Sequence, residues 1–159
     1  MDNVAQPSIV LRPLKFTDFP QVLLWNQDIQ FCEANGWSLN QDEERLFRWW
    51  GMFVNNTSND FFRIGIEWDQ KLIGYVDFAE VNNGGAEIGI AIGDSTLWQR
   101  GLGKEALSQA LEFGSKNYAI HSYRAETELS NVRAQNLLIR AGFKKIKQTD
   151  STIFYKVTL

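Results

Sequence analysis

The stretch from Trp98 to Ala106 combines two glycines and two basic residues at the start of a helical apolar pattern. Gly101 and Gly103 let the backbone approach a bulky ligand closely, because neither carries a side chain. The first amides of a helix have no intrahelical acceptor, and the helix dipole is positive at that end. With Arg100 and Lys104 beside them, these residues predict a site for a phosphate or pyrophosphate on a turn between a strand and a helix.

Two known phosphate-binding patterns can be compared with this turn. A Walker A loop requires G-x-x-x-x-G-K followed by Ser or Thr, but Trp98 occupies its first glycine position and Glu105 follows Lys104. The dinucleotide-binding pattern G-x-G-x-x-G/A is matched from Gly101 to Ala106. A Rossmann unit expects further alternating strands and helices, whereas this turn follows an antiparallel meander and few elements come after it. Because the glycine pattern itself matches, a nicotinamide-dinucleotide-binding enzyme is kept as an alternative.

The elements before the turn follow from the spacing of apolar residues. Strands are predicted over 8–14, 62–68, 72–81 and 86–92, and helices over 17–25 and 40–53. The sequence Asn82-Asn83-Gly84-Gly85 favours a tight hairpin, because Asn and Gly tolerate positive φ. The strand over 86–92 therefore runs antiparallel to its predecessor and leads directly into the turn.

The elements after the turn alternate between helix and strand. Helices are predicted over 102–114 and 131–141, and strands over 123–129, 143–147 and 152–159. A strand, helix and strand of this length favour a right-handed parallel crossover. We therefore expect an α/β fold with one mixed, mostly antiparallel, seven-stranded sheet and four helices. No repeat or linker interrupts residues 1–159, which are predicted to form a single domain.

The composition restricts partners and location. Sixteen basic and nineteen acidic residues give a net charge of −3, so no basic field would hold a nucleic acid. One Cys and one His cannot form a disulfide or a His/Cys metal cluster, which fits a reducing cytoplasm. We find neither a targeting signal in residues 1–7 nor an apolar run long enough to span a membrane. Exposed strand edges would allow a homodimer.

The order of elements and several motifs resemble the GNAT family of N-acetyltransferases over nearly the whole chain. The acyl-CoA signature of that family, Q/R-x-x-G-x-G/A, is matched at Gly101 and Gly103, with Trp98 at its first position. A Trp there resembles the branch of ribosomal-protein N-terminal and small-amine acetyltransferases. Four further motifs are similar to that branch: Leu11-Arg12-Pro13-Leu14, Ala86-Glu87-Ile88-Gly89, Asn131-x-x-Ala134-x-x-Leu137 and Ala141-Gly142-Phe143.

The resemblance implies that acetyl-CoA is the co-substrate and lies between two splayed parallel strands. Its pantetheine would bind the backbone of Ile90 and Ile92, and Asn131 would contact the cofactor from the neighbouring loop. The pyrophosphate would lie on the turn, where the predicted contacts are Trp98, Gln99, Arg100, Gly101, Leu102, Gly103 and Lys104. The acceptor would be a primary amine of a polyamine, an aminoglycoside-like molecule or a protein N-terminus, and it would attack the thioester directly.

Catalysis of this transfer needs a base, because an ammonium group must lose a proton before it attacks. Glu87 is the predicted base, since it shares a strand face with the small residues Gly89 and Ala91. Asp77 and Glu80 on the preceding strand are alternatives.

The general acid is less obvious in this sequence. Many members of the family place a tyrosine directly after the position of Leu137, where this chain has Leu138. Ser130 is the predicted replacement, with Tyr123, Tyr155 or water as alternatives. The missing tyrosine also leaves open a non-catalytic acyl-CoA sensor.

The acceptor is expected to enter over the first two helices, where aromatic and acidic side chains would suit an amine. The predicted substrate-binding residues are Trp25, Glu33 and Trp37.

Overall fold

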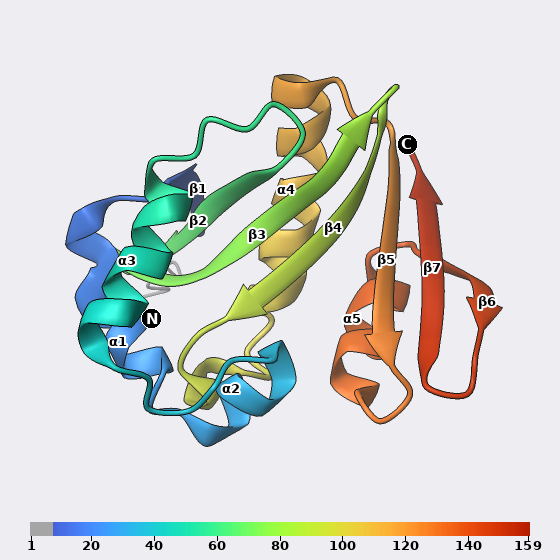
Figure 1. The fold of residues 1–159 in the computed structure, drawn as a ribbon. Coiled ribbons are helices and arrows are strands. Elements are labelled where there is room, and N and C mark those ends of the chain that lie inside the picture. Colours follow the sequence, from blue (N-terminus) through green and yellow to red (C-terminus); the bar gives the residue numbers. More distant parts are fainter. Residues whose placement is uncertain (1–7) are drawn as a thin grey trace, which may run out of the picture.

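The structure is a computed structural model that describes residues 8–159 and contains one sheet of seven strands (Figure 1). The strands are β1 (Val10–Pro13), β2 (Phe62–Trp68), β3 (Lys71–Asn82), β4 (Gly85–Ile92), β5 (Ser122–Glu128), β6 (Lys144–Gln148) and β7 (Thr152–Thr158). They lie in the order β1-β2-β3-β4-β5-β7-β6, and all neighbours are antiparallel except β4 and β5. The predicted mixed, mostly antiparallel sheet is confirmed.

The α-helices of the described residues number five rather than the predicted four. They are α1 (Phe19–Trp25), α2 (Ile29–Asn35), α3 (Glu43–Val54), α4 (Leu102–Tyr118) and α5 (Val132–Arg140). The unexpected helix is α2, which begins where the carboxylate of Asp28 accepts a hydrogen bond from the Phe31 N–H at 3.2 Å. An Asp at this position satisfies an amide that the helix itself leaves free, and it allows a new helix to start directly after α1.

The two faces of the sheet are covered by different helices (Figure 1). On one face α4 packs its buried stripe, which includes Ala106, Leu107 and Ala110, into a core cluster that also contains Ile88 and Ile92 of β4. On the other face α1 and α3 form an aromatic core that includes Ala91 of β4. Side chains alternate along a strand, so Glu87 and Gly89 lie on the same face as Ala91.

The hairpin between β3 and β4 positions the strand that enters the turn. Asn83 and Gly84 both have positive φ, at 51° and 77°. These two left-handed residues produce the tight connection that the Asn-Asn-Gly-Gly sequence predicts. β4 therefore lies antiparallel to β3 over nearly its whole length.

None of the helices within residues 8–159 is long and apolar enough to cross a membrane. The expectation about a targeting signal in residues 1–7 lies outside the described residues.

Candidate functional site

The parallel strands β4 and β5 pair over a short distance only. Their paired residues are Gly85 with Ser122, Ala86 with Tyr123 and Glu87 with Arg124. Beyond Glu87, β4 continues beside β3 while β5 continues beside β7, and the ends of the two strands move apart (Figure 1). The facing edges of both strands are therefore left without each other's hydrogen bonds, in a gap that an extended ligand could enter.

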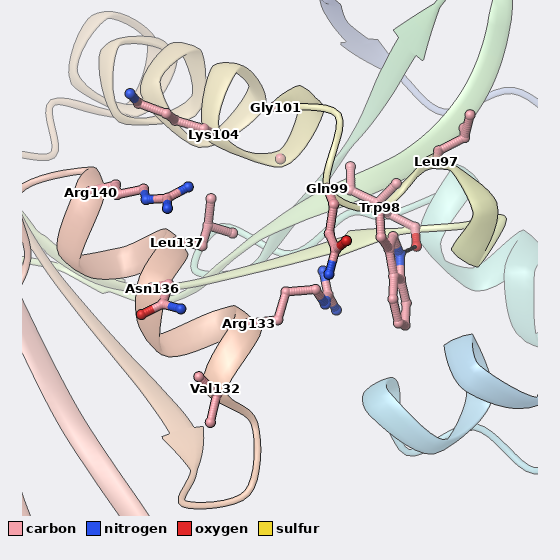
Figure 2. A pocket seen from close by; sticks show the side chains of 12 residues that line it. Leu97, Trp98, Gln99, Gly101, Lys104, Val132, Arg133, Asn136, Leu137 and Arg140 are labelled. Atoms are coloured by element: carbon pink, nitrogen blue, oxygen red, sulfur yellow. Dashed lines mark hydrogen bonds between the residues drawn. The ribbon is translucent and has the colours of Figure 1, made fainter.

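Two cavities occupy this gap and its mouth. The inner cavity, of about 380 Å³, is lined by residues of β4, β5, α2 and α5. The outer cavity, of about 550 Å³, lies between the turn before α4 and the helix α5 (Figure 2). Ile92, Gly103, Arg133 and Leu137 line both cavities. One elongated ligand could therefore extend from the strands to the turn.

The glycines of the turn have different tasks. Gly101 precedes α4 with φ 80°, a left-handed conformation that favours glycine. The first bond of the helix runs from the Glu105 N–H to the Gly101 oxygen at 3.1 Å, so the amides of the three preceding residues have no helical acceptor. Gly103 lines both cavities, and an added Cβ would lie 3.6 Å from Leu137. Larger side chains at Gly103 would therefore occupy the ligand space.

Positive side chains surround the outer cavity. Lys104 of α4 and Arg133 and Arg140 of α5 line it from two sides (Figure 2). The Arg133 guanidinium lies over the Trp98 ring, 3.7 Å from its centroid, and burial lowers the Arg133 pKa. No salt bridge among the described residues includes Arg133. A half-buried cation without a carboxylate partner suits a bound anion.

Most of the predicted cofactor residues lie in these two cavities. Ile90 and Asn131 line the inner cavity, and the outer cavity is lined by Trp98, Gln99, Gly101, Gly103 and Lys104, with Ile92 in both. The exceptions are Arg100, whose side chain is exposed, and Leu102, which is buried in the core. Asn131 also caps α5, because its side-chain oxygen accepts a hydrogen bond from the Ala134 N–H at 3.1 Å. The indole N–H of Trp98 donates to the Ile92 oxygen at 3.0 Å.

Glu87 stands at the point where β4 and β5 separate. Its pKa is raised by burial and by the nearby carboxylates of Glu126 and Glu80, whereas Arg124 lowers it. Glu126 lines the inner cavity, as does Glu128 two residues later. Negative charge is thus concentrated on the sheet face that Glu87 shares with α1 and α3.

Asp77, one alternative base, is committed to another partner. Its two carboxylate oxygens accept hydrogen bonds from Arg63 at 2.7 and 2.9 Å. The Arg63 guanidinium also lies 3.8 Å from the Phe53 ring centroid and 3.9 Å from that of Tyr75. This arrangement holds Asp77 as a structural ion pair.

The candidates for the general acid lie in different surroundings. Ser130 is exposed and lines a separate surface hollow with Ser151 and Thr152, and it lines neither the inner nor the outer cavity. Tyr123 is fully buried and donates its hydroxyl to the Leu111 oxygen at 2.7 Å. Leu138 lines the inner cavity without offering a donor.

The predicted substrate residues are not gathered at the gap. Trp25 is 2% exposed and packs against Trp50 at a ring distance of 6.1 Å, so it belongs to the core in this conformation. The Trp37 indole donates to the Tyr75 hydroxyl at 3.2 Å. Glu33 is exposed on α2, and the two residues after it, Ala34 and Asn35, line the inner cavity.

Arg133 and Thr127 are among the cavity residues that the sequence analysis missed. Arg133 lies two positions after Asn131, and Thr127 follows Ala125 on the same face of β5. The spacing of Arg133 from Asn131 and of Thr127 from Ala125 could have indicated that both residues face the cavity. The sequence gives no signal that the Thr127 hydroxyl has no hydrogen-bond partner within residues 8–159. In the same part of the chain no group of three or more His, Cys, Asp or Glu side chains could hold a metal ion.

Comparison with known proteins agrees with this architecture. Residues 8–144 match the family model of the acetyltransferase (GNAT) domain. The uncharacterized protein MJ1062 of Methanocaldococcus jannaschii is 25% identical over 155 residues, which are 95% of this chain and 31% of that protein. This chain therefore spans about a third of that relative.

Solved structures share the fold at low sequence identity. A GNAT-family acetyltransferase from Bacillus anthracis is 14% identical, with a TM-score of 0.82 over 97% of this chain and 96% of that chain. The spermidine N-acetyltransferase from Vibrio cholerae, in complex with CoA and spermine, is 18% identical, with a TM-score of 0.79 over 95% of both chains. The family match covers most of the described residues, and the chain belongs to the GNAT family of acetyltransferases.

Proposed function

We propose that this domain transfers the acetyl group of acetyl-CoA to a primary amine. The observation that carries this proposal is the gap between β4 and β5, which opens at Glu87 and leads to the cationic outer cavity. This arrangement offers a candidate base beside Ile88 and Gly89, which line the inner cavity, and an anion site in the outer cavity. Acetyl-CoA matches this arrangement, because its thioester and its phosphates lie at opposite ends of the long pantetheine chain.

The backbone of β4 supports the binding of a pantetheine chain. The Gly93 N–H donates to the Ile73 oxygen of β3 at 2.5 Å. Backbone groups alternate between the two edges of a strand, so those of Ile90 and Ile92 are directed away from β3 and toward the gap. A pantetheine amide would pair with this edge as an added strand does. The Trp98 indole already uses the Ile92 oxygen, which leaves the Ile92 N–H for the ligand.

The phosphates would bind at the other end of the gap. The free amides at the start of α4 and the helix dipole favour a pyrophosphate there. Lys104, Arg133 and Arg140 line the same cavity and would neutralise its charge. The residues present therefore fit a CoA molecule along both cavities.

Acetyl-CoA would supply the acetyl thioester, and the residues of this chain would move the amine proton. Glu87, directly or through a water molecule, would accept the proton of the ammonium group. Its raised pKa brings it closer to neutrality and makes it a stronger base. The amine nitrogen would then form a bond to the carbonyl carbon while the carbon–sulfur bond breaks and the thiolate leaves with the electron pair. The acylated nitrogen would release its second proton to water.

The carboxylates near the gap favour a positively charged acceptor. Glu126 and Glu128 line the inner cavity and would attract an ammonium group. A polyamine, an aminoglycoside-like amine or a peptide N-terminus would each satisfy this condition. The Vibrio cholerae relative, which was solved with spermine, makes polyamines the first acceptors to test.

One experiment separates this function from its alternatives. The domain would be mixed with acetyl-CoA, CoA or NAD(H), and its melting temperature measured, followed by release of free thiol with a panel of amines. We expect stabilisation by acetyl-CoA and CoA, and thiol release that depends on the amine. Stabilisation by NAD(H) alone would contradict the proposal and favour a nicotinamide-dinucleotide enzyme. Binding of acetyl-CoA without thiol release with any amine would indicate a sensor.

A further inference from the structure

The Thr127 side chain presents an unexplained polar group beside the inner cavity. Thr127 is 6% exposed, and its hydroxyl has no hydrogen-bond partner among the described residues. Buried polar groups without a partner are rare and costly, and each calls for an explanation such as a functional role. Thr127 also lines the inner cavity, so a ligand that enters there could supply the missing partner.

The position of Thr127 in β5 is firmly held. Its backbone pairs with Ile153 of β7. The buried residues of β5 alternate, so Thr127 shares a face with Ala125, and both line the inner cavity together with Leu138 of α5. Thr127 is therefore close to the place where a tyrosine would be expected and where this chain has Leu138.

No other hydroxyl in the inner cavity is equally free. Thr127 and Thr152 are the hydroxyl-bearing residues that line it. The Thr152 hydroxyl interacts with the Ser151 hydroxyl at 3.2 Å. No described residue forms a hydrogen bond with the Thr127 hydroxyl, so its O–H bond is free to rotate toward a ligand in the cavity.

We propose that the Thr127 hydroxyl donates a hydrogen bond to the thioester sulfur as the sulfur leaves. This inference rests on the proposed acetyl transfer. As the carbon–nitrogen bond forms and the carbon–sulfur bond breaks, the sulfur takes the electron pair and the Thr127 O–H stabilises the negative charge. Thr127 keeps its proton, the two protons that the ammonium nitrogen loses pass to Glu87 and to water, and the thiolate later takes a proton from solvent.

The test compares Thr127→Val with Thr127→Ser. Valine keeps the shape of threonine but lacks the hydroxyl, whereas serine keeps the hydroxyl. Loss of an unpaired buried hydroxyl leaves the ligand-free protein as stable as before or more stable, because no hydrogen bond is broken. An unchanged or higher melting temperature of Thr127→Val would therefore show that a loss of rate is not a loss of folding.

The expected rates follow from the strength of a hydrogen bond to a charged group. In single-turnover experiments Thr127→Val should be slower than wild type by about 10- to 100-fold, with unchanged affinity for acetyl-CoA. Thr127→Ser should stay within about threefold of wild type, because a hydroxyl is still present.

A second measurement does not depend on activity. A donor to sulfur stabilises the thiolate of bound CoA and lowers its pKa. Titration of bound CoA, followed by the ultraviolet absorbance of the thiolate, should give a pKa about one unit higher in Thr127→Val than in wild type.

The outcomes separate this inference from the proposed function. An active wild type with an equally fast Thr127→Val variant and an unchanged thiol pKa would overturn the role of Thr127. Weaker acetyl-CoA binding at an unchanged rate would also overturn it, because the hydroxyl would then contact the pantetheine. A wild-type domain that binds acetyl-CoA but releases no thiol with any amine would contradict the acetyl transfer instead.

Discussion

The Arg133 guanidinium lies 3.7 Å from the centre of the Trp98 ring, so that α5 and the turn before α4 touch across the outer cavity. The ring is fixed in turn by its hydrogen bond to the Ile92 oxygen. Arg133 lines both cavities, and its charge has no carboxylate partner in the described part of the chain. A phosphate is the partner that this position best accommodates.

We therefore expect Arg133→Gln to weaken CoA binding by about tenfold or more at low salt, because a charge-assisted hydrogen bond is lost. The difference from wild type should become smaller at high ionic strength, because Arg133 is half-buried and salt still screens part of its attraction for a phosphate. Isothermal titration calorimetry at two salt concentrations measures both effects. The control is Arg100→Gln, which removes an exposed charge that lines neither cavity. Equal losses in the two variants would argue against a specific contact.

Replacement of Gly103 tests whether both cavities hold the ligand. Gly103→Trp should remove the rise in melting temperature that CoA produces, because the ring would fill space that Gly103 lines in both cavities. Gly103→Ala is the matched control, since its Cβ would lie at an ordinary contact distance of 3.6 Å from Leu137. Thermal shifts with and without CoA measure the effect. If Gly103→Trp still responds to CoA as wild type does, the ligand does not bind along this turn.

Glu87 is expected to act as the base, so Glu87→Gln should lower the rate by about 10²- to 10⁴-fold. A base must be deprotonated, and the wild-type rate should therefore fall as the pH drops through the raised pKa of Glu87. Profiles of kcat/KM against pH, measured with one amine, show this acidic limb. A Glu87→Gln variant with unchanged activity would remove Glu87 from this role.

Charges near Glu87 should move the acidic limb of the pH profile of kcat/KM in opposite directions. Glu126→Gln removes a carboxylate that raises the Glu87 pKa, so the limb should shift to lower pH. Arg124→Gln removes a cation that lowers the same pKa, so the limb should shift to higher pH. Shifts in the same direction in both variants would show that another group controls the profile.

Asp28 connects α2 to the segment that leads into the turn. Its carboxylate accepts hydrogen bonds from the Phe31 N–H at 3.2 Å and from the Ser95 N–H at 2.6 Å. Asp28→Ala should lower the free energy of unfolding by about 2 kcal/mol, from one cap and one further hydrogen bond. Asp42→Ala should lower it by only about 1 kcal/mol, because Asp42 caps α3 through Arg45 alone. Urea denaturation measures both, and equal losses would mean that the Ser95 contact adds nothing.

The contribution of Asp28 should also depend on pH. Burial raises the Asp28 pKa, but the amides of Ser95 and Phe31 lower it by more, so the folded-state pKa lies below the ordinary value. A lowered pKa means that the stabilisation is complete above the unfolded pKa of about 3.9 and is lost as the pH falls through the folded pKa. The difference between wild type and Asp28→Ala in urea should therefore shrink below about pH 4.

Local patterns predicted the sheet and the turn because each rests on nearby residues. The alternation over β4 predicted the face that Glu87 shares with Gly89 and Ala91, and the Asn-Gly hairpin predicted the direction of the strand. The α2 helix was missed because its start depends on one capping carboxylate, that of Asp28, immediately after the end of α1.

The parts that could not be predicted depend on packing between distant elements. Trp25 was expected at the substrate site, but it is buried because Phe31 of α2 and Trp50 of α3 pack against its ring, which the sequence of α1 alone does not show. The free hydroxyl of Thr127 could not be predicted either. It depends on whether β7, α5 and β4 place a hydrogen-bond donor or acceptor beside it, and they place none. Spacing along one strand carries no such information.

The short ladder between β4 and β5 divides the sheet into two parts, β1–β4 and β5–β7, whose backbones pair at only three residue pairs. Beyond Glu87 the two parts share no backbone hydrogen bonds, and they are held together by the core cluster that contains Ile92 of β4 and Ala125 of β5. A ligand that forms hydrogen bonds with both edges would add a direct link between the two parts of the sheet. The acetyl donor would then stabilise the fold as well as react. Amide hydrogen exchange at the separated ends of β4 and β5 would slow when it binds.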